Sequence, residues 1–256
     1  MSTQSVVTAI RVLETVSEFQ PIGLSELARR LEASKATVFR ALTTLETLSW
    51  VVQGEGGGLG TDWSLTPHAY SVAVRGGAMR SLRDAALGPM SALQLKSTET
   101  VHLAVPDGDA LVLAERIDTS HALRAFLALG SRVPLHASAT GLAFLSASTD
   151  RVVERYLGGA LERVSPRTIT DPERLWDEIR IIRGRGFAIN EEGMSEGITS
   201  VGAPIVNQSG VPMACVSISG PSSRVTPDRF VTAGEAVRAT AKEIALRIEA
   251  QWTPGT

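Results

Sequence analysis

Cysteine, long apolar runs and net charge are all scarce in this 256-residue sequence. The single Cys215 has no partner for a disulfide within the chain, and its strand-like surroundings "MACVSIS" favour a buried, unreactive thiol. No stretch approaches the roughly 18 unbroken apolar residues of a membrane span, and the start "MSTQSVVTAIRVLETV" carries no basic leader or cleavage site. We therefore expect a soluble, cytoplasmic protein without a membrane partner.

The net charge of -2 at pH 7 gives no reason to expect a polyanionic partner from the overall field. Positive charge is nevertheless concentrated locally: Arg29, Arg30, Lys35 and Arg40 fall within twelve residues that contain one acidic side chain, Glu32. The rest of the composition, 43% hydrophobic and 20% charged, is typical of a globular protein with a core. The length favours two domains.

The basic stretch lies in a region with helical periodicity. A first amphipathic helix is predicted to end near Phe19, before Pro21 and Gly23. Its predicted inward stripe is Val6, Ile10, Leu13 and Val16. Ser25 and Ser34 are predicted to cap two further short helices, joined by a turn at Glu32.

Two short helices with a tight joint form a helix-turn-helix, whose second helix can lie in the major groove of DNA. The second helix, from Ser34 to about Leu48, turns one face inward with Val38, Ala41, Leu42 and Leu45. Its other face offers donors for phosphates and base edges. The predicted DNA-binding residues are Ser25, Ser34, Lys35, Ala36, Thr37, Arg40 and Thr44.

A strand-like "WVVQ", the glycine-rich "GEGGGLGTD" and a short "WSL" follow this helix. A hairpin directly behind a recognition helix is the wing of a winged helix-turn-helix domain. The alternative is a small helical domain with a solvated basic face that contacts a protein, in a non-enzymatic small-molecule sensor. Salt-dependent DNA binding separates the two readings.

The remaining chain mixes hairpins with helices, which predicts an α+β domain around an antiparallel sheet flanked by helices. Residues 67–80 are predicted as a linker helix, so the predicted domains are 1–66, 67–80 and 81–256. Further strands are predicted in "ETVHLAVPDGDALVLAERI", "LRAFLAL", "GFAIN", "TSVGAPIVN" and "VPMACVSISG". Further helices are predicted from about Ala137, over 149–158 and 171–184 with Asp150 and Asp171 as caps, and over 226–251 with Pro227 at the first position.

Three enzymatic or cofactor-binding interpretations are weak. "GMSEG", residues 193–197, matches the G-x-S-x-G of a hydrolase elbow, but "NEE" precedes it and every histidine lies upstream. The histidines lack metal-binding spacing, and His102 and His136 are interpreted as satisfied core imidazoles. "GEGGGLG" fits no nucleotide-binding loop. We expect no enzymatic activity, cofactor or metal.

Three motifs carry a family resemblance: "GSRVPLHASATGLAFL", "RGFAINEEGMSEGITSVGAPIVN" and "VSISGPSSRVT". With the N-terminal winged helix they resemble the IclR family of bacterial transcriptional regulators, over nearly the whole chain. The resemblance implies a C-terminal effector domain of GAF-like architecture and assembly as a dimer or a dimer of dimers. It also implies operator DNA as a partner, a small carboxylate or aromatic acid as effector, and control of catabolic genes.

The resemblance implies a ligand site made of Ala139, Thr140, Asn190, Ser200, Ser217 and Ser219. Ser217 and Ser219 alternate along a predicted strand, so both hydroxyls face one side, and backbone N–H groups at the start of a helix favour an anion. The family usually has Asp at the position of Asn190 and Cys at that of Ser200. The alternative is that these small polar residues only satisfy neighbouring backbone groups.

Overall fold

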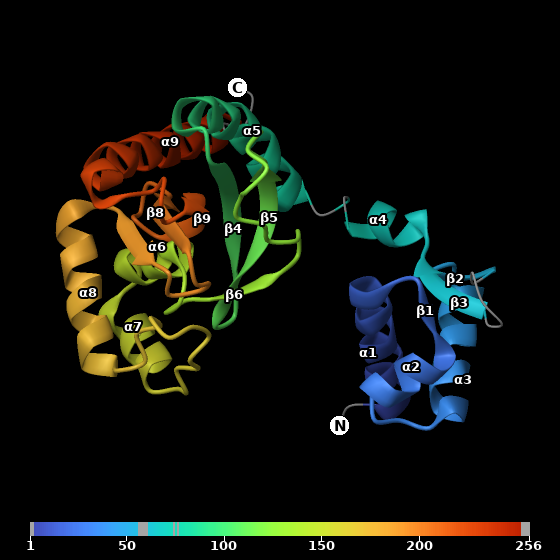
Figure 1. The fold of residues 1–256 in the computed structure, drawn as a ribbon. Coiled ribbons are helices and arrows are strands. Elements are labelled where there is room, and N and C mark those ends of the chain that lie inside the picture. Colours follow the sequence, from blue (N-terminus) through green and yellow to red (C-terminus); the bar gives the residue numbers. More distant parts are fainter. Residues whose placement is uncertain (1–2, 56–60, 74, 76, 252–256) are drawn as a thin grey trace. The chain divides into compact units, whose positions relative to one another are not determined.

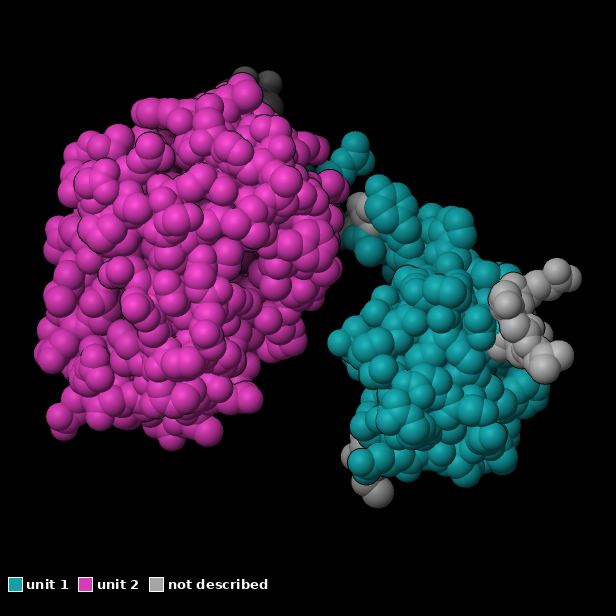
Figure 2. Space-filling view, viewed as in Figure 1, with its two compact units in different colours: residues 1–80 teal, residues 81–256 magenta. Residues whose placement is uncertain are grey.

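The computed structural model describes residues 3–55, 61–73, 75 and 77–251 (Figure 1). The chain divides into two units, residues 1–80 and 81–256, which are coloured separately in Figure 2. Among the described residues, no helix is both long and apolar enough to cross a membrane.

Unit 1 is a winged helix-turn-helix. Its helices are α1 (Gln4–Phe19), α2 (Leu24–Arg30), α3 (Lys35–Thr47) and α4 (Pro67–Ala73). Its antiparallel sheet has the order β1-β3-β2 and consists of β1 (Ile22–Gly23), β2 (Val51–Glu55) and β3 (Thr61–Leu65). The predicted hairpin behind α3 is confirmed as β2 and β3, and its predicted glycine turn at 56–60 lies outside the described residues.

The core of unit 1 confirms the predicted inward face of α3, because Val38, Ala41, Leu42 and Leu45 are all buried. The stripe predicted for α1 is partly wrong. Val12 and Val16 are buried, whereas Val6 and Ile10 are 59% and 48% exposed. Both pairs have helical spacing, so periodicity alone could not tell which face meets α3.

The N-caps of the two short helices differ from each other. Ser34 caps α3 as predicted, accepting a hydrogen bond from the Thr37 N–H at 3.1 Å. Ser25 does not cap α2, which begins at Leu24 with Gly23 in the cap position. The reason is the short strand β1: Ile22 and Gly23 pair with β3, so the backbone leaves its extended form at Gly23.

A single linker helix over 67–80 is not observed. Helix α4 ends at Ala73, and a new helix, α5 (Gly77–Ser97), begins four residues later and continues into unit 2. Positions 74 and 76 of the predicted linker helix lie outside the described residues.

Unit 2 is built on a six-stranded antiparallel sheet of order β6-β5-β4-β9-β8-β7. This confirms the antiparallel sheet predicted from the sequence. Its strands are β4 (Thr100–Asp107), β5 (Ala110–Ile117), β6 (Arg132–Pro134), β7 (Ala188–Glu191), β8 (Ile198–Val206) and β9 (Pro212–Pro221). Its remaining helices are α6 (Ala139–Ala147), α7 (Asp150–Leu157), α8 (Pro172–Arg185) and α9 (Phe230–Gln251).

Helices cover both faces of this sheet (Figure 1). One apolar cluster joins α5 and α9 to strand residues such as Leu103 and Val216. The other joins α6, α7 and α8 to Ala104 and Cys215, the next residues of each strand pair. Successive strand residues point to opposite faces, so β4 and β9 each contribute to both clusters.

Three local predictions in unit 2 need correction. "LRAFLAL", residues 123–129, is not a strand: the Leu123 and Leu127 carbonyls accept from the side chains of Arg224 and Arg116 rather than from a neighbouring strand. Asp150 is the first residue of α7 and not its cap, whereas Asp171 caps α8 as predicted. Pro227 begins a 3-10 turn that leads into α9.

Candidate functional site

The first candidate surface is the outer face of α3. Lys35, Ala36, Arg40 and Thr44 are exposed on it, as predicted. Within the part of the chain that the structure describes, neither Lys35 nor Arg40 makes an ion pair. Their charges are therefore available to phosphates or base edges.

The hydroxyls on α3 are less free than the charges. Thr37 is half-buried, and its hydroxyl lies 2.9 Å from that of Ser34, which also accepts from the Thr37 N–H. The Thr44 hydroxyl donates to the Arg40 carbonyl at 2.9 Å. Ser34 and Thr37 thus begin the helix, while Ser25 lies exposed on α2.

The neighbouring arginines on α2 are neutralised locally. Arg29 and Arg30 both pair with Glu26, at 2.5 and 2.7 Å, so the basic stretch has a second acidic neighbour beyond Glu32. The hydrogen bond from Arg29 lowers the pKa of Glu26 below its ordinary value. Arg30 also stacks on the Phe19 ring at 3.5 Å. The uncompensated charge of the helix-turn-helix therefore comes from Lys35 and Arg40.

The second candidate site is a cavity of about 100 Å³ between the sheet of unit 2 and α6. All six residues predicted for the ligand site line it: Ala139, Thr140, Asn190, Ser200, Ser217 and Ser219. The structure adds the polar residues His102, Ser138 and Ser195. Apolar side chains that include Leu113, Phe126, Leu127 and Val133 complete the wall.

Strand register places the polar residues side by side on one face of the sheet. Asn190 pairs with Ser200, which pairs with Ser219. In the adjacent row, Gly202 pairs with Ser217, which pairs with His102. Paired residues of antiparallel strands point to the same side, so side chains from β7, β8, β9 and β4 form one polar floor. We call Asn190, Ser200, Ser217, Ser219 and His102 the polar floor.

Helix α6 begins directly over this floor. The Ser138 hydroxyl caps the helix by accepting from the Gly141 N–H at 3.0 Å, while the N–H groups of Ala139 and Thr140 precede the first intrahelical bond. A Cβ added to Gly202 would lie 2.8 Å from the Ala139 carbonyl oxygen, so the absence of a side chain on β8 permits this approach. The positive end of the α6 dipole thus faces the cavity.

Asn190 is oriented by its own turn. Its Oδ1 accepts from the Gly193 N–H at 3.0 Å, and the side chain is buried. A backbone N–H only donates, so the oxygen of the amide is assigned to this bond and the NH₂ group remains as a donor. An aspartate here would place a second acceptor at the same point.

His102 departs from the sequence-based interpretation. It is 7% exposed; its Nδ1 lies 3.2 Å from the Ser219 hydroxyl, and its Nε2 has no hydrogen-bond partner. Burial, reinforced by the charge of Arg116, lowers the pKa of His102 to about 4, so the imidazole is neutral at pH 7. His136, in contrast, is a satisfied imidazole as predicted, with the Tyr156 hydroxyl at 2.7 Å and the Glu162 carbonyl at 2.8 Å.

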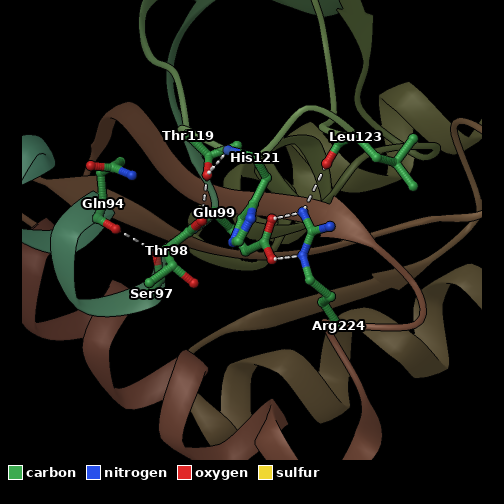
Figure 3. A network of polar contacts seen from close by, with 8 residues as sticks. All are labelled: Gln94, Ser97, Thr98, Glu99, Thr119, His121, Leu123 and Arg224. Carbon is green, nitrogen blue, oxygen red and sulfur yellow. Dashed lines mark hydrogen bonds and ion pairs between the residues drawn. The ribbon is translucent and has the colours of Figure 1, made fainter.

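The cavity is walled by the segment between β5 and β6, residues 118–131. The Arg224 guanidinium holds it by donating to the Leu123 carbonyl at 3.0 Å. Arg224 is itself held by the buried Glu99 carboxylate, with contacts of 2.5 and 2.7 Å (Figure 3). The Thr119 hydroxyl adds a bond to the Thr98 carbonyl (Figure 3). These polar contacts tie the wall to the short connection between α5 and β4.

Sequence reasoning missed His102, Ser138 and Ser195 as cavity residues. His102 follows the alternation of β4, but nothing local indicates that β4 pairs with β9. Ser195 belongs to the "GMSEG" match and lies in the turn between β7 and β8. An antiparallel strand follows this serine instead of a helix, so the hydrolase elbow is absent. No group of three or more potential metal ligands occurs among the described residues.

Comparison with known proteins assigns a family to both units. Residues 5–55 match the IclR helix-turn-helix domain, and residues 78–246 match the bacterial transcriptional regulator IclR C-terminal domain. The chain is 32% identical over 230 residues to the HTH-type transcriptional regulator KdgR of Escherichia coli K12, over 90% of this chain and 86% of that protein. It is 34% identical over 230 residues to the HTH-type transcriptional repressor AllR of Klebsiella pneumoniae, over 88% and 82% of the two chains.

Solved structures show the same fold. An IclR homolog from Microbacterium hydrocarbonoxydans complexed with 4-hydroxybenzoate gives a TM-score of 0.84 at 26% identity, covering 96% of this chain and 99% of that one. The IclR protein of Thermotoga maritima gives a TM-score of 0.77 at 25% identity, covering 96% and 98%. These relatives are regulators rather than enzymes, and the chain belongs to the IclR family of DNA-binding bacterial transcriptional regulators.

Proposed function

We propose that a small organic acid binds the cavity of unit 2 and thereby changes the affinity of unit 1 for operator DNA. The observation that carries this proposal is the convergence of the polar floor and the N-terminus of α6 on one cavity. Such coupling requires two states of the protein that differ in affinity for the ligand.

The chemistry of the cavity supports an acid as the ligand. The hydroxyls of Ser217 and Ser219, the Asn190 NH₂ group and the first N–H groups of α6 are donors, and a helix N-terminus favours negative charge. No carboxylate side chain of the described chain lines the cavity. The apolar wall, with Leu113 and Phe126, suits a hydrocarbon or aromatic portion.

The size of the cavity supports a small ligand. Its volume of about 100 Å³ exceeds that of one water several times but is well below the roughly 300–1,000 Å³ of pockets for drug-sized molecules. 4-Hydroxybenzoate, bound by the relative from Microbacterium hydrocarbonoxydans, is a small molecule of this kind, with a carboxylate, an aromatic ring and one hydroxyl group. We propose a carboxylate or aromatic acid of similar or smaller size, and genes for its catabolism as the targets.

On the DNA side, we propose that α3 enters the major groove with Lys35, Ala36, Thr37, Arg40 and Thr44 toward the duplex. Ser34 and Ser25 are proposed to contact phosphates beside it. Lys35 and Arg40 support this arrangement because they are exposed and make no ion pair with any residue that the structure describes. The hairpin of β2 and β3 follows α3 directly, where a wing reaches the DNA backbone.

We also propose that the protein acts as a homodimer or tetramer, which would present two or more copies of α3 to a symmetric operator. The exposed apolar residues Val6, Val7 and Ile10 on α1 support an interface that one chain does not supply. Light scattering at micromolar concentration should give a mass of at least twice 27.1 kDa. A monomer at that concentration would contradict this part.

The ligand-coupling proposal is tested with purified full-length protein. DNA ligands are first selected from a random-sequence pool, and small carboxylic acids are screened by thermal shift, because a ligand of the native state raises the melting temperature. An acid that binds should change DNA affinity about 5- to 150-fold. The variant with both Ser217→Ala and Ser219→Ala should lose this response, whereas Ser209→Ala, in the exposed turn after β8, should keep it. An acid that binds the wild type and leaves DNA affinity unchanged would refute coupling.

A further inference from the structure

One residue that lines the cavity has a polar side-chain atom without a partner among the described residues. Among the described residues, the buried side-chain atoms without a hydrogen bond are Thr100 Oγ1 and His102 Nε2, and of these two residues His102 lines the cavity. A buried polar group without a partner is unusual, because water is lost without replacement. The imidazole is 7% exposed, so bulk solvent does not compensate Nε2.

We propose that His102 contacts the ligand directly, donating its Nε2–H to a carboxylate oxygen, while the Ser219 hydroxyl donates to Nδ1 and sets the tautomer. This proposal rests on the proposed function, since it concerns the same site and the same class of ligand. It adds a donor on β4 to the Ser217 hydroxyl, the Asn190 amide and the helix N-terminus, and it commits the single proton of the Ser219 hydroxyl to His102 rather than to the ligand.

The hydrogen bonds around the ring favour this tautomer. A neutral imidazole has one donor and one acceptor nitrogen, and the partner of one nitrogen decides the role of the other. The Ser219 hydroxyl makes no other hydrogen bond within the described chain, so its proton is free for Nδ1. Nε2 then carries the hydrogen and requires an acceptor.

Of the charged groups near His102, Arg116 acts against a cationic imidazole and outweighs Asp118, whose negative charge raises the pKa of the ring. Arg116 stands opposite His102 on β5, with its guanidinium held by Asp118 at 2.8 Å and by the Leu127 carbonyl. Ser217 and Ser219 face His102 from β9, and the start of α6 adds only backbone N–H groups and the Thr140 hydroxyl. With positive charge from Arg116 and from the helix end, the ring serves as a neutral donor to an anion.

Two substitutions at His102 separate its two nitrogens. The amide of asparagine reaches the position of Nδ1, so His102→Asn keeps a group beside Ser219 and removes the donor at Nε2. The longer glutamine reaches the position of Nε2, so His102→Gln keeps a donor toward the ligand. The probes are benzoate and 4-hydroxybenzoate, with benzamide as a neutral control, titrated calorimetrically into each full-length protein.

We expect His102→Asn to bind benzoate about 10- to 100-fold more weakly than wild type, the range for loss of a hydrogen bond to a charged group. His102→Gln should stay within about threefold of wild type, well inside a tenfold step. Benzamide should bind more weakly than benzoate to the wild type and should discriminate less between the variants. Equal affinity of His102→Asn and wild type for benzoate would overturn the proposal.

The ¹⁵N NMR shifts of the imidazole distinguish direct ligand contact from a purely structural role of His102, because a structural role predicts no ligand-induced shift of Nε2. With ¹⁵N-labelled histidine the chain has four imidazoles, and the signals absent from His102→Asn identify His102. The free protein should show the tautomer with hydrogen on Nε2, and benzoate should shift that nitrogen more than Nδ1. Hydrogen on Nδ1, or no shift of Nε2 by an acid that binds, would overturn the proposal.

The two proposals fail in different ways. If neither benzoate nor 4-hydroxybenzoate binds the wild type, the proposed contact between His102 and a ligand carboxylate is refuted for aromatic acids, a class of ligand proposed for this cavity. If an acid binds and shifts Nε2 but leaves DNA affinity unchanged, His102 is a ligand contact and the proposed coupling fails. If DNA affinity responds while Nε2 does not shift, the coupling stands and the role of His102 falls.

Discussion

The two candidate surfaces of this protein use polar groups in opposite ways. On α3, the charges of Lys35 and Arg40 stand in solvent, where salt screens them and no internal partner holds them. In unit 2, the polar floor is buried except for the half-buried Ser200 and is uncharged at pH 7, and its groups act at hydrogen-bond distance. A solvent-exposed charge can interact with a polyanion such as DNA in many relative positions. A buried hydrogen-bond donor binds one small ligand in one orientation. The comparison predicts different responses to salt, pH and substitution.

The largest effect is expected on α3. The double substitution Lys35→Ala and Arg40→Ala should weaken operator binding about 100-fold or more, because interactions of this kind with DNA are each worth about 1–3 kcal/mol. The slope of log affinity against log salt should also fall by about one for each phosphate that is no longer neutralised. Fluorescence anisotropy with a labelled operator measures both.

The matched control is Arg29→Ala, which removes another exposed arginine that Glu26 already neutralises. It should leave the salt slope close to wild type, and acid binding in unit 2 should be unchanged in all these variants. If Arg29→Ala lost as much operator affinity as the double variant of Lys35 and Arg40, the distinction between paired and unpaired charges on this surface would be wrong.

The second effect is a pH dependence confined to the cavity. His102 has a folded-state pKa of about 4 against an ordinary value near 6.5, so the unfolded chain binds more protons between these values. Its contribution to the free energy of unfolding is present above about pH 6.5 and is lost as pH falls toward 4, up to about 3 kcal/mol. Chemical denaturation from pH 7.5 to 4.5 should show a flatter profile for His102→Asn than for wild type. Parallel profiles would contradict a buried, neutral imidazole.

The third effect concerns the wall of the cavity. Removing Arg224 leaves the Glu99 carboxylate, which is 4% exposed, without its partner and releases the Leu123 carbonyl. Because Arg224 is itself partly exposed, we expect Arg224→Met to cost about 2 kcal/mol, below the roughly 3–5 kcal/mol of a fully buried pair.

Arg132 provides the control for this prediction, since it pairs with Asp107 where both side chains are more than half exposed. Arg132→Met should change the free energy of unfolding by less than about 1 kcal/mol. Urea denaturation measures the free energy of unfolding of both variants. A larger loss of stability for Arg132→Met than for Arg224→Met would contradict the greater importance of the ion pair between Arg224 and Glu99.

The smallest effect is steric. Gly202→Ala should destabilise unit 2 by about 1–2 kcal/mol, because its Cβ would meet the Ala139 carbonyl and push the start of α6 away from the polar floor. Acid binding should weaken with it. Gly184→Ala in α8 has open space around the new Cβ and should be neutral or slightly stabilising. Thermal melts with and without benzoate distinguish lost stability from a displaced helix.

Much of the fold followed from local pattern. The helix-turn-helix, the hairpins of β4 with β5 and of β8 with β9, and the cap at Asp171 have short-range signals in turn residues and periodicity. The wrong local predictions share a cause. From the local sequence, Val6 looks like part of a buried helix face, Ser25 like a helix cap, and residues 123–129 like a strand. Their states depend on α3, on β3 and on contacts with the side chains of Arg116 and Arg224, none of which the local pattern shows.

By itself, the sequence determined which residues of α3 face outward, because one helical repeat places Lys35 and Arg40 on the side opposite Val38, Leu42 and Leu45. Through three motifs that resemble a family, it also predicted six residues that line one cavity in the structure. Only the tertiary structure decided that β4 pairs with β9, which sets His102 beside Ser217 and Ser219 with one nitrogen unpartnered. Pairing between strands more than a hundred residues apart is decided by the packing of a whole sheet against its helices, and no local pattern carries that information.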